Sequence, residues 1–155
     1  MNKAMDRTVT TDSPEKTMEL GAKVAGTLSP GDLVALTGDL GTGKTMFVKG
    51  MAEGLGIPGE RVNSPSFVIL REYAGTRPLY HFDVYRLDED QFAETVDYRM
   101  YFYGAGLSVV EWADKIEHIL PEEYLRVDMA YGQKRQRRLR FTAQGNRFAE
   151  TIGSL

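Results

Sequence analysis

The stretch Gly38-Asp39-Leu40-Gly41-Thr42-Gly43-Lys44-Thr45 matches the phosphate-loop pattern G-x-x-x-x-G-K-[ST]. Glycines allow backbone angles and close approaches that a side chain would block, so successive amide N–H groups can converge on phosphate oxygens. The lysine adds a positive charge for the β- and γ-phosphates, and the threonine hydroxyl is a ligand for Mg²⁺. We therefore expect these eight residues to contact ATP and its metal ion: Gly38, Asp39, Leu40, Gly41, Thr42, Gly43, Lys44 and Thr45.

The residues on both sides of this loop have the patterns that the motif requires. Residues 33–37 form a short apolar run, which predicts a buried strand. Residues 45–55 place apolar side chains on one face, which predicts a helix that ends near Gly56. Because a strand, a glycine-rich loop and a helix follow one another, a chance match of four fixed positions is a poor explanation.

The rest of the chain predicts further strands and helices. Ser13-Pro14 has the features of a helix start. The remaining segments predict an α/β, P-loop NTPase-like three-layer fold, with a mixed sheet that has a parallel centre and antiparallel additions, in one domain over residues 1–155. These segments are a hairpin of residues 67–73 and 78–87, a helix over 88–103, a strand over 107–111, a helix over 114–120, and a closing strand pair over 124–131 and 137–142.

Composition excludes several kinds of function. The chain has no cysteine, which excludes disulfides, thiolate chemistry and cysteine metal sites. Its net charge of -3 provides no overall attraction to nucleic acid or to an anionic membrane. No uninterrupted apolar run approaches the roughly 18 residues of a membrane span, and the first residues lack a signal-peptide core. We expect a soluble, cytoplasmic protein.

Two acidic residues near strand ends are candidates for metal binding and hydrolysis. Glu111 follows the apolar run 107–110, and Asp83 lies in the segment 79–86. A phosphate-loop site needs an acid for Mg²⁺ and a group that orients the attacking water. The pattern does not decide which acid binds Mg²⁺ and which orients the attacking water. Trp112 is expected near the nucleotide or an interface. The two histidines, His81 and His118, are expected to be structural, because two histidines without clustering are poor evidence for a transition metal.

Together with the loop, three further segments give the chain a recognisable signature: Ser64-Pro65-Ser66-Phe67, Tyr80-His81-Phe82-Asp83-Val84-Tyr85-Arg86-Leu87 and Val110-Glu111-Trp112. In this order and spacing they resemble the TsaE (YjeE) family of small bacterial ATPases. The resemblance extends from about residue 17 to about residue 148. The His-Phe-Asp-x-Tyr-Arg block followed by Glu-Trp carries most of its specificity, since the loop alone is generic.

The resemblance implies a role in making threonylcarbamoyladenosine on tRNA. A family member acts with a TsaB–TsaD complex, hydrolyses ATP weakly alone, and meets tRNA only indirectly. Lys44 would bind phosphates. Thr45 and Glu111 would hold Mg²⁺, and Asp83 would assist near the metal ion or its water. Ser66 would belong to a switch-like loop near the γ-phosphate. The family usually carries a Gly and an acid where this chain has Asp97 and Met100.

Three other functions stay open from the sequence. A small-molecule kinase would need an acceptor pocket, with Arg71, Arg86 or Arg99 in a lid. A GTPase would carry Asn/Thr-Lys-x-Asp, which residues 114–117 match only distantly. A nucleotide-gated binding module would order residues 64–67 for a partner with negligible turnover. The basic stretch 133–140 is interpreted as a solvated face in preference to a contact with an acidic partner.

Overall fold

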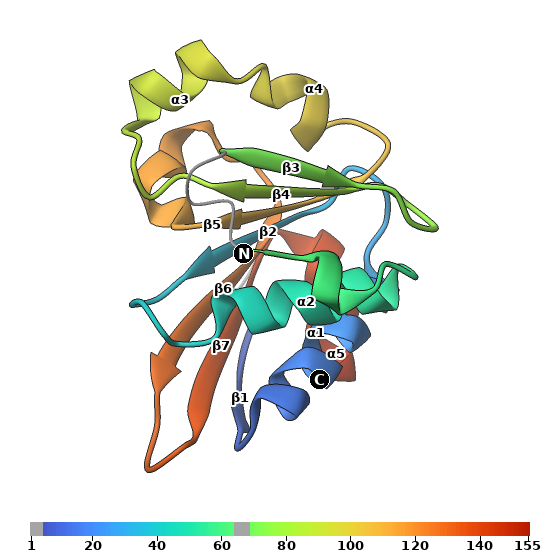
Figure 1. Ribbon diagram of the computed structural model, residues 1–155, viewed down its shortest axis with the longest axis vertical. Helices are drawn as coiled ribbons and strands as arrows, with labels where there is room; N and C mark the ends of the chain where they lie inside the picture. Colours follow the sequence, from blue (N-terminus) through green and yellow to red (C-terminus); the bar gives the residue numbers. More distant parts are fainter. Residues whose placement is uncertain (1–4, 64–68) are drawn as a thin grey trace.

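The computed structural model describes residues 5–63 and 69–155, which form a seven-stranded mixed sheet in the order β1-β7-β6-β2-β5-β4-β3 (Figure 1). The four central strands run parallel, whereas β1, β7 and β3 pair antiparallel with their neighbours. This arrangement confirms the predicted fold class. The strands are β1 (Met5–Thr11), β2 (Leu33–Thr37), β3 (Leu70–Tyr73), β4 (Leu79–Asp83), β5 (Leu107–Glu111), β6 (Tyr124–Tyr131) and β7 (Arg137–Gln144).

Helices cover both faces of the sheet. One face packs against α1 (Pro14–Thr27), α2 (Lys44–Gly54) and α5 (Ala149–Ser154), and the other lies under α3 (Glu89–Thr95), α4 (Tyr98–Phe102) and the 3₁₀ helix η2 (Ala113–Ile119) (Figure 1). Two shorter 3₁₀ turns are η1 (Gly59–Arg61) and η3 (Asn146–Phe148). Because side chains alternate along a strand, β2 serves both cores: Val34 and Leu36 enter one, Leu33 and Ala35 the other.

Local sequence explains how α1 and α2 begin and pack. The Ser13 hydroxyl accepts a hydrogen bond from the amide of Lys16 at 3.1 Å, which caps α1. The two helices pack closely at Gly50, where a β-carbon would lie 2.0 Å from the carbonyl oxygen of Met18. This close contact fixes α2, which directly follows the phosphate loop, against α1.

Several predicted boundaries were wrong. The helix expected over residues 88–103 is two helices, since Val96 takes an extended conformation between them (φ -123°) and Asp88 builds a capping box only for α3. The strand expected over 78–87 ends at Asp83. The helix expected over 114–120 is of the 3₁₀ type and begins at Ala113.

Two terminal elements were not predicted at all. Strand β1 is largely exposed, so it lacks the apolar pattern that marks a strand, and it forms because β7 offers an edge. Helix α5 has six residues and buries only Thr151 and Ile152 within them. Among residues 5–63 and 69–155, no helix has both the length and the apolar character needed to cross a membrane.

Candidate nucleotide-binding site

The loop between β2 and α2 has the backbone conformation that only glycines adopt readily. Gly38, Gly41 and Gly43 have φ values of 136°, 80° and 101°. A β-carbon on Gly38 would lie 2.4 Å from the carbonyl oxygen of Met129, and one on Gly41 would lie 2.6 Å from the hydroxyl of Tyr131. The glycines of the motif are therefore required by the fold as well as by any anion that the loop binds.

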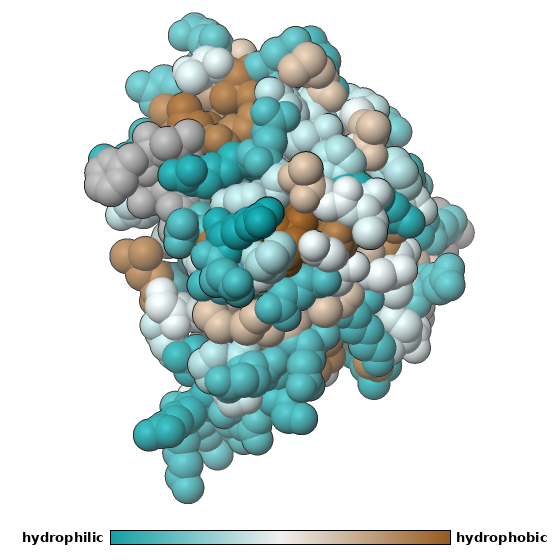
Figure 2. Space-filling view, turned by 45° about the vertical axis from the view of Figure 1, so that its right-hand side comes forward, coloured by the Kyte–Doolittle hydropathy of each residue, from teal (hydrophilic) through white to brown (hydrophobic). Residues whose placement is uncertain are grey.

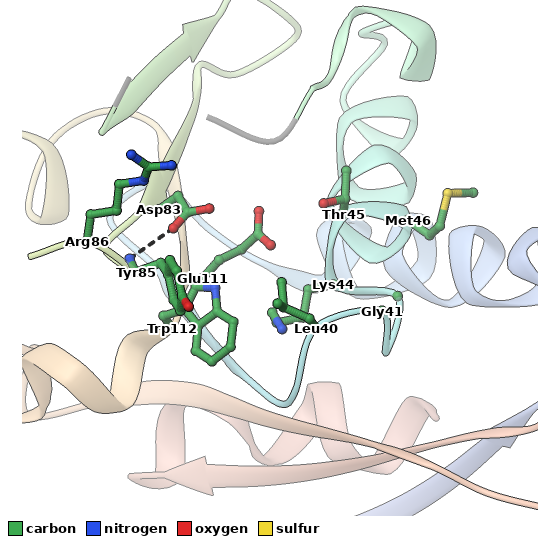
Figure 3. Close-up of a pocket in the computed structure, with 11 residues that line it drawn as sticks. Leu40, Gly41, Lys44, Thr45, Met46, Asp83, Tyr85, Arg86, Glu111 and Trp112 are labelled. Atoms are coloured by element: carbon green, nitrogen blue, oxygen red, sulfur yellow. Dashed lines mark hydrogen bonds between the residues drawn. The ribbon is translucent and has the colours of Figure 1, made fainter. Parts of the chain in front are cut away.

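A pocket of about 490 Å³ opens beside this loop (Figure 3). The loop and α2 line one side of it, and the ends of β4 and β5 with the residues that follow them line the other. The loop and α2 contribute Leu40, Gly41, Gly43, Lys44, Thr45 and Met46, and the strand ends contribute Asp83, Tyr85, Arg86, Glu111 and Trp112.

Lys44 is engaged by its own loop. Its ammonium group donates hydrogen bonds to the carbonyl oxygens of Gly38 at 2.5 Å and Asp39 at 2.9 Å. It also lies over the ring of Trp112, 4.2 Å from the centroid, in a cation–π contact. Burial lowers the pKa of Lys44, while the nearby carboxylates, Glu111 first among them, act in the opposite direction. The charge is thus held by neutral acceptors that a phosphate could replace.

The two candidate acids face each other across neighbouring strands. Asp83 and Glu111 are register partners in the parallel pair β4–β5, and both are buried, with 7% and 3% exposed surface. Asp83 accepts a hydrogen bond from the amide of Tyr85 at 3.0 Å. Figure 3 shows the carboxyl group of Glu111 between Asp83 and Thr45. The fold therefore gathers both acids and the Thr45 side chain at one edge of the sheet.

These side chains are the oxygen donors available for a metal ion. Within the described residues, no group of three or more His, Cys, Asp or Glu side chains could hold a metal alone. The pocket instead offers two carboxylates and one hydroxyl. This donor set fits Mg²⁺, which is usually held by one or two carboxylates together with substrate phosphates and water.

Trp112 lines the pocket and has an unusual backbone conformation. Its backbone is left-handed, with φ 63° and ψ 36°, at the point where β5 leads into η2. Its ring packs against Tyr85, with centroids 4.8 Å apart. Tyr85, which was quoted only in the family signature, and Arg86, which was considered only as a lid residue of a kinase, also line the pocket. The available signal was that both closely follow Asp83 in the signature.

Sequence reasoning missed a contact from the far end of the chain. In the β6–β7 hairpin, the hydroxyl of Tyr131 donates to the carbonyl oxygen of Leu40 at 2.6 Å, and Arg137 donates to that of Gly41 at 3.5 Å. Arg137 also lies over the Tyr131 ring, 4.6 Å from its centroid. The hairpin therefore holds the tip of the phosphate loop. These contacts join residues more than 90 positions apart in the sequence, so no local pattern predicts them.

A second, smaller pocket lies beside this hairpin. It has a volume of about 160 Å³ and shares Gly41, Gly43 and Met46 with the first pocket. Its remaining lining comes from the start of α1 and from the hairpin, namely Ser13, Pro14, Thr17, Arg135 and Arg137. The loop thus lies between a pocket lined by both carboxylates and a smaller pocket whose described lining contains no acidic residue.

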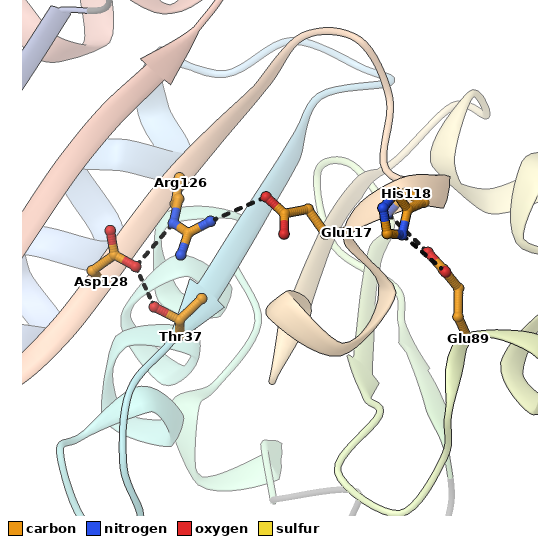
Figure 4. A network of polar contacts seen from close by, with 6 residues as sticks. All are labelled: Thr37, Glu89, Glu117, His118, Arg126 and Asp128. Atoms are coloured by element: carbon orange, nitrogen blue, oxygen red, sulfur yellow. Dashed lines mark hydrogen bonds and ion pairs between the residues drawn. The ribbon is translucent and has the colours of Figure 1, made fainter.

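A polar network supports the base of the loop (Figure 4). The hydroxyl of Thr37, the last residue of β2, donates to Asp128 on β6. Asp128 also accepts from Arg126 at 2.9 Å, and Arg126 pairs with Glu117 at 3.8 Å. Figure 4 also shows His118 beside Glu89, which ties η2 to the start of α3. His118 is therefore a surface contact of the scaffold.

The predicted site residues largely converge. The pocket brings together Leu40, Gly41, Gly43, Lys44, Thr45, Asp83, Glu111 and Trp112. Gly38 and Asp39 turn their carbonyl oxygens to Lys44, and the Thr42 hydroxyl donates to the Asp39 carbonyl at 2.8 Å inside the loop. Ser66 lies outside the described residues.

Comparison with known proteins identifies the family. The family model described as "Threonylcarbamoyl adenosine biosynthesis protein TsaE" matches residues 11–139. A curated Bacillus subtilis protein, "tRNA threonylcarbamoyladenosine biosynthesis protein TsaE", is 46% identical over 89% of this chain and 86% of its own. A Treponema pallidum protein with the same name is 38% identical over 87% and 92%.

A solved structure agrees with the sequence comparisons. A crystal structure of Bacillus subtilis YdiB superposes with a TM-score of 0.84 at 38% identity, covering 99% of this chain and 98% of its own. The similarity thus extends over the fold of nearly the whole chain, not only over a shared motif. On these findings the chain belongs to the TsaE family.

Proposed function

We propose that this protein binds ATP with Mg²⁺ and hydrolyses it as an accessory protein of tRNA N6-threonylcarbamoyladenosine biosynthesis, acting with a TsaB–TsaD complex in the cytoplasm. The names of its relatives supply the pathway. One observation carries the ATPase proposal: a glycine-built phosphate loop and two buried carboxylates share one pocket. On this proposal tRNA is met only through the partner complex.

The loop supplies phosphate binding. Backbone amides at the start of α2 carry the partial positive charge of the helix N-terminus, which favours an anion. The ammonium group of Lys44 can exchange its two carbonyl acceptors for phosphate oxygens, a stronger pairing because both partners are then charged. The loop would therefore bind a triphosphate with little rearrangement of its backbone.

The acids supply metal binding and water orientation. Thr45 and Glu111 would hold Mg²⁺, which neutralises charge on the phosphates when bound. Asp83 would accept a hydrogen bond from the attacking water or from a metal-bound water, since it lies opposite Glu111 in register. Arg86, from the same pocket, adds a guanidinium group that can stabilise the charge that develops on the phosphoryl oxygens.

The smaller pocket is the candidate site for the adenine base. It lies across the loop from the acids and includes Ser13 and Thr17 at the start of α1. The guanidinium groups of Arg135 and Arg137 can stack on a planar ring. Competition between ATP and GTP for the nucleotide-binding site distinguishes an ATPase from a GTPase.

The kinase alternative has limited support. Of Arg71, Arg86 and Arg99, only Arg86 lines the pocket within the described chain, and Arg99 instead lies over the Tyr98 ring. A kinase would release little phosphate without an acceptor, so phosphate release from ATP and Mg²⁺ alone distinguishes hydrolysis from transfer. Consumption of ATP only when a small-molecule acceptor is added, with no release of phosphate, would contradict the ATPase proposal.

The decisive experiment measures ATP hydrolysis with and without the TsaB–TsaD complex. We expect slow turnover alone and faster turnover with the complex. Asp83→Asn and Glu111→Gln separate the two acids, because the variant that still binds Mg²⁺ and ATP but does not hydrolyse it identifies the hydrolytic residue. Equal, negligible turnover with and without the complex would instead favour the nucleotide-gated binding module.

A further inference from the structure

A buried histidine lies directly behind Glu111. His81 on β4 is fully buried, and its Nε2 lies 2.5 Å from Oε2 of Glu111 on β5. His81 and Asp83 are two residues apart, so they share a face of the sheet. The register pairs Asp83 with Glu111 and His81 with Val109, which makes His81 the diagonal neighbour of Glu111. A long glutamate side chain reaches such a neighbour.

The chemistry of the contact defines the donor. An ionised carboxylate only accepts hydrogen bonds, so Nε2 of His81 carries the proton and donates it to Oε2. Among the described residues, Nδ1 of His81 has no hydrogen-bond partner. The ring is thus held at one nitrogen only, and that nitrogen points at the carboxylate that faces the pocket.

The bond leaves one oxygen of Glu111 for the pocket. Asp83 and Glu111 bring two negative charges to directly opposed positions, which repel each other. A donor behind Glu111 offsets part of this repulsion and restricts the rotation of the carboxylate. Such partners of metal-ligating carboxylates commonly set ligand orientation, and their loss typically costs about 10–100-fold in metal affinity.

We infer that His81 is a positioning residue, whose Nε2–H fixes the carboxylate of Glu111 so that its other oxygen is oriented toward the Mg²⁺ of the bound nucleotide. This inference rests on the proposed function, since it assumes that Glu111 serves the metal. It assigns His81 no contact with nucleotide, because the ring lies behind the carboxylate and does not line the pocket among the described residues.

Two matched variants test the inference. In His81→Gln the amide nitrogen reaches about as far as Nε2, whereas in His81→Asn it ends near the position of Nδ1 and cannot reach Glu111. Electron paramagnetic resonance of Mn²⁺, titrated into each variant with a non-hydrolysable ATP analogue, measures metal affinity without turnover. We expect His81→Asn to lose about 10–100-fold in Mn²⁺ affinity and His81→Gln to stay close to the parent.

A second measurement isolates the metal effect. Binding of a fluorescent ADP analogue in the presence of EDTA should be equal in the parent and both variants, because the loop and Lys44 are untouched. Parent-like Mn²⁺ affinity in folded His81→Asn would overturn the inference, as would equal losses in His81→Asn and His81→Gln. If Glu111→Gln keeps the parent's Mn²⁺ affinity, the metal role proposed for Glu111 fails as well, so the two failures are distinguishable.

The unmodified protein provides a readout if a variant does not fold. Nitrogen-15 spectra of the histidine rings report which nitrogen of His81 carries the proton. A proton on Nε2, with a signal that shifts in Glu111→Gln, supports the inference. A neutral ring protonated only at Nδ1 would overturn it, since Nε2 could then donate nothing to Glu111.

Discussion

At the residue scale, the ammonium group of Lys44 is held by two carbonyl oxygens of its own loop and by the Trp112 ring. Lys44→Ala removes the charge that pairs with phosphate. We expect triphosphate binding to weaken by about 1.5–3 kcal/mol, the usual contribution of a hydrogen bond to a charged group, which is roughly 10–100-fold in affinity. Titration with a fluorescent ATP analogue measures this loss.

The same helix offers a matched control. Lys49 lies on α2 and does not line the pocket in the described chain, so Lys49→Ala should leave nucleotide affinity unchanged. Both variants should retain the parent's circular dichroism spectrum. If Lys44→Ala binds and hydrolyses ATP at the parent level, the phosphate site is assigned to the wrong residues.

Trp112 should report nucleotide binding directly. It is the single tryptophan of the chain, and the Lys44 ammonium lies over its ring. When Lys44 moves to phosphate, the charge beside the indole changes, so the intrinsic fluorescence should change on addition of ATP and Mg²⁺. Lys44→Ala should show a different resting signal and a much smaller response. An unchanged spectrum at saturating nucleotide would contradict this coupling.

At the element scale, the contact between α1 and α2 depends on a glycine. Gly50→Ala would place a β-carbon 2.0 Å from the Met18 carbonyl oxygen, and backbone atoms cannot turn aside as a flexible side chain does. We expect the helices to separate and the free energy of unfolding to fall by about 1–3 kcal/mol. Urea unfolding followed by circular dichroism measures the change.

Gly26 on α1 is the matched control. A β-carbon there meets nothing within 4 Å, and its φ is not in the left-handed range. Gly26→Ala should therefore stabilise the protein by about 0.4–1 kcal/mol, because alanine restricts the unfolded chain. Equal effects of the two substitutions would show that helix propensity, and not the α1–α2 contact, governs both.

At the scale of the whole molecule, stability should fall in alkaline solution through Tyr124. Burial raises the pKa of the Tyr124 hydroxyl, with Arg126 acting in the opposite direction. Between the unfolded pKa of about 10 and the higher folded one, the native state keeps a proton that the unfolded state releases. Stability is thus fully present below about pH 10 and falls as the pH rises above it.

Tyr124→Phe removes this dependence. Compared with the variant, the parent should lose free energy of unfolding between about pH 9 and pH 11, while the lysines and arginines common to both cancel. Urea midpoints at the two pH values give the comparison. Parallel pH profiles for the two proteins would mean that Tyr124 titrates normally in the folded state.

Sequence patterns determined much of the fold because they act over short distances. The strand, loop and helix over residues 33–55 follow from apolar runs and glycines within a few positions of one another, and they match β2 and α2 closely. The end of the strand that carries Glu111 was visible in the same way, whereas the strand that carries Asp83 was expected to continue to residue 87. Where local signals were weak, as at Val96 and in the exposed strand β1, the boundaries were wrong or missing.

By itself, the sequence determined the phosphate loop, the parallel strands around it and the two acids beside it. Tertiary structure alone decided that His81 holds Glu111 and that Tyr131 holds Leu40, across separations of 30 and 91 residues. Such contacts depend on strand order and register, which place residues together only once the sheet has formed. A periodic pattern indicates which face of a strand a side chain occupies, but it does not indicate which other strand pairs with that strand.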